Sequence, residues 1–123
     1  MSHARYVFEI RVRPESTRDD LTLSPAEMSV KLYKDAAQPG EDGWLFFRDY
    51  LWRGKLNETA PFRSDLEAAY SLRVVSVEFK GLQTSTAYLD ALKDEIHGHL
   101  DLFNADTVDE VLNKYLGSSI QVT

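Results

Sequence analysis

The strict alternation of apolar and polar residues in the first expected strand constrains the fold more than any other feature of the sequence. In residues 5–13, the aromatic and β-branched side chains fall on one side and mostly charged side chains fall on the other. This period of two is typical of a strand with one buried face. Residues 28–34 and 74–80 repeat the pattern. Because buried parallel strands give continuous apolar runs instead, the sequence predicts a mostly antiparallel sheet with one face in water.

Helical periodicity and capping residues predict helices in the second half of the chain. Residues 86–102 place apolar side chains on one face of an amphipathic helix. Thr107 and Glu110 have the spacing of a capping box ahead of another helix, and Ser64 and Glu67 have the same spacing ahead of a third.

The fold class follows from combining these elements. A glycine suited to ending the last helix, Gly117, precedes a short expected strand at 119–122, and another short strand is expected at 21–23. With a further helix in the aromatic segment described next, we predict an α+β fold in a single domain over residues 1–123. Its sheet is mostly antiparallel with four to five strands, and four helices pack on one face.

The segment GWLFFRDYLWRG, residues 43–54, holds both tryptophans of the chain and seven large apolar or aromatic side chains in nine positions. A helix over 44–52 is favoured because Gly43 and Gly54 bracket it. A strand is the alternative, since it would also gather the aromatic rings on one face. We expect the segment to pack in the core, with Trp44 and Trp52 both mostly buried.

Arg48 interrupts this apolar segment and has two interpretations. A guanidinium among apolar side chains requires a partner, so an ion pair with a structural carboxylate is the favoured one. The alternative is an anion site flanked by the two indoles, which would combine cation–π and bidentate contacts. The candidate binding residues of the segment are Trp44, Arg48, Trp52 and Arg53.

The water-facing side of the sheet offers a second candidate surface. Basic residues outnumber Glu9 and Glu78 there and surround one tyrosine, so we expect a basic patch on an acidic protein. The candidate residues are Arg11, Arg13, Lys31 and Tyr33, with Arg5 and Lys80 beside them. The patch could serve protein association or self-association, as the aromatic segment could, or it could bind anions or nucleic acid.

Catalytic and metal-binding patterns are missing from the sequence. The chain has no cysteine, which excludes disulfides and thiolate sites. We find no phosphate-binding loop, nucleophile elbow or HExxH pattern, so we predict no catalytic residue, metal or cofactor and lean against an enzyme. A helical stripe of Asp90, Asp94, His97 and Asp101 could hold a cation weakly, but a solvated face is the favoured interpretation. No apolar run has the length of a signal peptide or membrane span, so we expect a cytoplasmic protein without membrane contact.

Four stretches together resemble the LWR-salt protein family, which takes its name from the triplet Leu51-Trp52-Arg53 and from its occurrence in salt-loving archaea. They are the aromatic segment, the N-terminal RYVF, AYLDALKDEI, and LDLFNADTVDEVLNKYLGSSI near the C-terminus. The resemblance covers nearly the whole chain. It implies a stand-alone domain in a haloarchaeal, high-salt cytoplasm and transfers no activity, ligand or catalytic residue.

Charge and salt together rank the two functional classes. The net charge is −6, with the acidic excess concentrated in residues 85–123. In strong salt, binding through phosphate contacts loses affinity steeply, and the Debye length falls to about 3 Å at 1 M. Apolar and short-range contacts survive these conditions. We therefore expect protein association, most simply a homodimer, and consider nucleic acid the weaker alternative.

Overall fold

The main sheet has four strands, and the computed structural model describes residues 3–14, 28–56, 60–70 and 72–123 of the chain. In spatial order the strands are β2 (Met28–Asp35), β1 (Ala4–Pro14), β5 (Leu72–Thr84) and β6 (Ile120–Val122). β1 pairs antiparallel with both β2 and β5, whereas β6 pairs parallel with the end of β5. The sheet is therefore mixed rather than wholly antiparallel. The strand expected at 21–23 lies outside the described residues.

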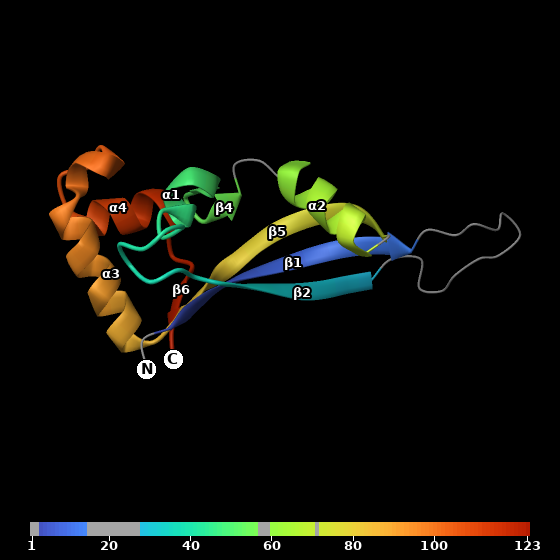
Figure 1. Cartoon of the computed structure of the whole chain (residues 1–123), viewed down its shortest axis with the longest axis horizontal. Helices are drawn as coiled ribbons and strands as arrows, with labels where there is room; N and C mark the ends of the chain where they lie inside the picture. The colour runs from blue at the N-terminus through green and yellow to red at the C-terminus, as the bar shows by residue number, and fades with distance from the viewer. Residues whose placement is uncertain (1–2, 15–27, 57–59, 71) are drawn as a thin grey trace, which may run out of the picture.

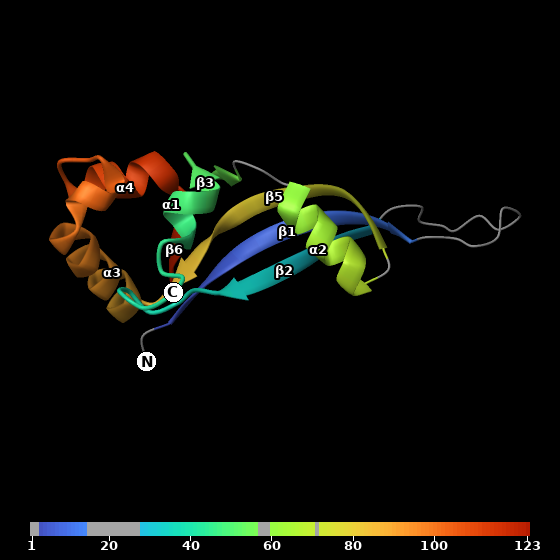
Figure 2. The ribbon, with the colours of Figure 1, turned by 45° about the horizontal axis from the view of Figure 1, so that its top comes forward.

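Helices complete an α+β fold, as predicted. They are α1 (Phe46–Tyr50), α2 (Ala60–Tyr70), α3 (Thr86–Gly98) and α4 (Val108–Tyr115), with a 3₁₀ helix, η1 (Leu100–Phe103), between the last two. A small hairpin pairs β3 (Leu51–Trp52) with β4 (Lys55–Leu56). Figure 1 shows α1, α3 and α4 gathered at one end of the long sheet, while α2 lies over its other half. Figure 2 shows α2 crossing the strands.

The predicted caps of α4 are confirmed in part, and α3 has an N-cap, Ser85, that was not predicted from the sequence. Ser85 accepts a hydrogen bond from the Tyr88 amide at the start of α3, and Thr107 accepts one from the Glu110 amide at 3.1 Å. Gly117 ends α4 with φ +60, and its amide donates to the Leu112 carbonyl. The predicted helix over 86–102 is shorter, because the backbone at His99 leaves the helical region and the chain continues as η1.

The capping box predicted at Ser64 is wrong. Helix α2 already begins at Ala60, so Ser64 lies inside the helix. Glu67 instead reaches across to the sheet, where its carboxylate accepts a hydrogen bond from the Val74 amide of β5 at 3.1 Å. Arg63 donates to the Val75 carbonyl beside it. These two side chains bond to backbone groups at the β5 edge, whose pairing with β6 is limited to residues 82–84.

The buried face of the sheet follows the predicted alternation on β1, whereas β5 departs from it at a bulge and the apolar side of β2 is largely exposed. Tyr6, Phe8, Ile10 and Val12 of β1 are all buried. Two register shifts between β1 and β5 mark β-bulges, and at one of them Val75 is left without a partner in β1. As a result Val74 rather than Val75 joins the core, because a bulge inserts one extra residue and changes which side chain faces inward.

Two buried tyrosines join the sheet to the helices. Tyr6 is 3% exposed and Tyr88 is 2% exposed. The Tyr88 hydroxyl donates to the Ala37 carbonyl at 2.6 Å. Burial raises the pKa of Tyr88 to about 12 and raises the pKa of Tyr6 further, with a contribution from the neighbouring Tyr88. Both phenols are therefore held in their neutral form.

Candidate binding surfaces

The first half of the aromatic segment is core, as expected. Trp44, Phe46 and Phe47 are buried, with Phe47 only 1% exposed. The Phe47 ring stacks on Phe103 with centroids 5.6 Å apart, and Trp44 meets the same ring edge-on at 5.9 Å. These contacts tie the segment to η1. Trp44 is therefore a packing residue, and its surface is not available to a partner.

The second half of the segment departs from the prediction. The helix covers only Phe46–Tyr50, and the chain then extends into β3. Leu51 is fully buried, but Trp52 points to the other side of the strand and is 43% exposed. The expectation that both tryptophans are mostly buried is therefore wrong for Trp52. Alternation along a strand separates two adjacent residues that a continuous helix would have kept within one broad apolar arc.

Arg53 and Gly54 form the two-residue turn of the hairpin rather than a helix end. Both have positive φ, +52 and +78, as a type I′ turn requires. The Arg53 amide donates to the Lys114 carbonyl at 2.9 Å, and the Gly54 amide donates to the Tyr115 carbonyl at 3.0 Å. The last carbonyls of a helix have no partner within it. The turn therefore caps the C-terminal end of α4 from outside.

Trp52 lies among basic side chains on this hairpin. The Arg53 guanidinium carbon and the Lys114 ammonium are each 5.8 Å from the centre of its ring. Tyr115 meets the indole edge-on, and Lys55 is its cross-strand partner. We call Trp52, Arg53, Lys55 and Lys114 the Trp52 patch. Sequence reasoning did not select Lys55 or Lys114, since neither gives a signal until the hairpin packs on α4.

Arg48 forms an ion pair, as favoured, but with its exposed neighbour. Its guanidinium lies 2.9 Å from the Asp49 carboxylate and also donates to the Leu102 carbonyl at 3.4 Å. The Arg48 side chain is 30% exposed. Within the described residues no cation–π contact joins Arg48 to an indole. The arrangement is a surface ion pair, which contributes little stability.

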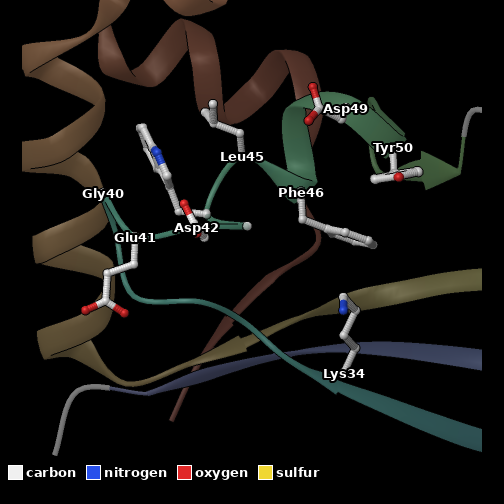
Figure 3. Close-up of a pocket in the computed structure, with 10 residues that line it drawn as sticks. Lys34, Gly40, Glu41, Asp42, Leu45, Phe46, Asp49 and Tyr50 are labelled. Atoms are coloured by element: carbon white, nitrogen blue, oxygen red, sulfur yellow. The ribbon is translucent and has the colours of Figure 1, made fainter.

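An open pocket of about 510 Å³ lies between the end of β2 and α1. Three carboxylates line it, those of Glu41, Asp42 and Asp49. Figure 3 shows Lys34 rising from β2 toward Phe46 across this space. The Lys34 ammonium is 5.4 Å from the centre of the Phe46 ring. The protein's own cation therefore occupies the position that a cationic ligand would take over this ring.

The outer face of the sheet carries the basic residues predicted for it, but some of these basic side chains are paired with carboxylates. Lys80 lies 3.5 Å from Glu9 and 3.2 Å from Glu78, and its pKa is raised mainly by the hydrogen bond to Glu78. The guanidinium carbon of Arg5 lies 4.1 Å from the centre of the Tyr33 ring. In the pairing of β1 with β2, Arg5 is opposite Asp35. The remaining basic members of this face are the predicted Arg11, Arg13 and Lys31, together with Arg73 opposite Arg13.

Strand β2 forms an open edge of the sheet. It pairs with β1 on one side, and across the described part of the chain no strand pairs with its other side. Met28 and Val30 belong to the helix-covered face but are each 43% exposed, and Tyr33 on the opposite face is 45% exposed. The sequence predicted their alternation correctly but could not indicate that β2 would lie at an edge.

The described residues contain no group of three or more His, Asp or Glu side chains placed to hold a metal ion. Asp90, Asp94, His97 and Asp101 are all exposed. No described helix is both long and apolar enough to cross a membrane.

Comparison with protein families decides where this chain belongs. The family model described as LWR-salt protein matches residues 2–123. The chain belongs to the LWR-salt protein family. No curated protein and no solved structure gives a significant match.

In this LWR-salt family member, each residue of the Leu51-Trp52-Arg53 triplet has a separate structural task. Leu51 fills the core with its side chain fully buried. Trp52 presents an indole at the surface beside two cations. Arg53 begins the turn that caps α4. Leu51 therefore packs in the core, Trp52 is exposed, and Arg53 belongs to the turn. Of the triplet, only Trp52 and Arg53 are accessible to a binding partner.

Proposed function

We propose that this protein is a self-associating interaction module that forms a homodimer through β2 in a salt-rich cytoplasm. The observation that carries the proposal is the open edge of β2 with its exposed apolar side chains, Met28, Val30 and Tyr33. An open edge presents unpaired N–H and C=O groups to another strand. The long edge of β5 is partly satisfied within the chain, because the side chains of Glu67 and Arg63 in α2 form hydrogen bonds with its backbone.

A two-fold axis beside Leu32 gives a favourable pairing of the two copies of β2. The four strands of each copy would join into one sheet of eight (four plus four). Lys31 would lie opposite Tyr33 of the partner subunit on the outer face. Val30 would lie opposite Lys34 of the partner subunit on the other face. This register avoids placing Lys31 against its own copy, which would be repulsive.

Strong salt favours this mode of association over nucleic-acid binding. Backbone hydrogen bonds and apolar burial act at contact distance, whereas phosphate contacts weaken steeply as salt rises. Six of the seven carboxylates in residues 85–123 are exposed, which suits a protein kept soluble in concentrated salt. On the outer face, Lys80 is already paired with Glu9 and Glu78, which leaves less positive charge for phosphates.

Light scattering in 2 M KCl tests the proposal with two matched variants. Val30→Lys adds a charge to the open edge, opposite Lys34 of the partner subunit, and should give a monomer. Val122→Lys makes the same change at an exposed valine on β6 and should leave the dimer intact. A monomeric wild-type protein, or a dimer that only Val122→Lys dissociates, contradicts the proposal. A labelled oligonucleotide in the same buffer should not bind, and tight binding would favour the nucleic-acid alternative.

A further inference from the structure

The Trp52 patch is a second surface on the molecule, separate from β2. The hairpin that carries it lies against α4, whereas β2 forms the far edge of the main sheet (Figures 1 and 2). A tryptophan exposed to 43% on a small domain is unusual, because large aromatic side chains are normally covered. Tryptophan and arginine are also the residues that contribute most at protein interfaces.

Lys114 is held in place by hydrogen bonds, and none of the cations of the Trp52 patch is neutralised by a described carboxylate. The Lys114 ammonium donates to the Phe103 carbonyl at 3.2 Å and to the Asn104 carbonyl at 3.4 Å, both of which are neutral groups. Arg53 is fixed through its backbone by the hydrogen bond to α4. No described carboxylate lies within ion-pair distance of Arg53, Lys55 or Lys114. Two positive charges therefore lie beside the exposed indole, with Lys55 opposite Trp52 in the hairpin register, on a chain whose net charge is −6.

We propose that the Trp52 patch docks an acidic segment of another protein. Carboxylates of that segment pair with Arg53 and Lys114, and an apolar side chain packs against the part of the indole that these two cations leave exposed. Charge complementarity identifies the partner as acidic, and the exposed ring requires an apolar group as well. Contacts of this kind are screened less than long-range attraction, because docking partly buries them.

A protein segment fits the Trp52 patch better than single-stranded nucleic acid does. Nucleic-acid binding would use the face of the indole as a stacking platform for a base. Arg53 and Lys114 already lie over this ring, so a stacked base would compete with them for the same position. Carboxylates instead approach the cations from outside and leave their contacts with the ring in place.

Fluorescence anisotropy of a labelled peptide tests this inference. The probe is a short synthetic peptide of alternating glutamate and leucine, compared with its lysine and leucine counterpart, in low and in molar KCl. We expect saturable binding of the acidic peptide alone. Trp52→Ala, Arg53→Asn and Lys114→Gln should each weaken it roughly five- to tenfold. Asparagine is chosen at position 53 because it tolerates positive φ better than most residues.

Matched controls separate this inference from the proposed homodimer and from misfolding. Lys93→Gln makes the same charge change on α3 and should leave binding unchanged. Each variant must keep the wild-type melting temperature within a few degrees, and the monomeric Val30→Lys variant should still bind the peptide. The inference is overturned if the acidic peptide does not bind at up to millimolar concentration, if the patch variants bind as wild type does, or if oligothymidylate binds more tightly than the peptide.

Discussion

Replacing Gly54 by alanine tests the docking of the hairpin on α4. Gly54 has φ +78, and a Cβ added there would lie 3.0 Å from the Leu116 carbonyl oxygen. A residue with a side chain in this conformation costs roughly 1–2 kcal/mol. The added contact also pushes the turn away from α4, which weakens the Gly54 amide bond to Tyr115, a bond contributing roughly 0.5–1.5 kcal/mol. The expected loss of unfolding free energy for Gly54→Ala is therefore about 1.5–3.5 kcal/mol.

Urea unfolding followed by circular dichroism measures this loss, with a second glycine as the matched control. Gly98 ends α3 with nothing within 4 Å of an added Cβ and without positive φ. Gly98→Ala should therefore be neutral or stabilise the protein by up to about 1 kcal/mol. Gly54→Asn, which relieves the backbone strain but keeps the contact with Leu116, should fall between the two. Equal stability of Gly54→Ala and Gly98→Ala would refute the docked turn.

Three further predictions concern the tryptophans, the tyrosines and salt. Trp44→Ala should cost about 3–5 kcal/mol, as large core truncations do; with Trp44→Phe the remaining Trp52 emission should be red-shifted and open to acrylamide, and protection would contradict its exposure. Because the pKa values of Tyr6 and Tyr88 are raised by folding, stability should be constant below about pH 10 and fall as pH rises toward 12, and the phenolate absorbance of these two tyrosines should appear only together with unfolding; ionisation of all tyrosines in a folded protein would contradict this. The melting temperature should rise across a KCl series because screening relieves repulsion among surface carboxylates, and a steady fall would argue against adaptation to salt.

The sequence by itself determined the elements whose stability is local or follows one period. The alternation in residues 5–13 and 28–34 predicted β1 and β2 nearly to the residue, because a period of two is typical of extended chain; on β1 the apolar face is also buried in the core. Thr107 caps the helix that follows it, and Gly117 supplies the left-handed residue after α4. These effects act within one turn of chain, so neighbouring residues suffice to predict them.

Only the tertiary structure decided which predicted surfaces meet a neighbour. The aromatic segment was apolar over most of a helical circumference, so its period alone did not show that the helix would stop at Tyr50 and that Trp52 would face water. The turn at Arg53 and Gly54 is fixed by carbonyls of α4, sixty residues further along the chain. The order of the strands places β2 at an edge of the sheet. A bulge in the pairing of β5 with β1 turns Val75 away from the core. Contacts between distant segments depend on how whole elements pack, and no local pattern encodes that geometry.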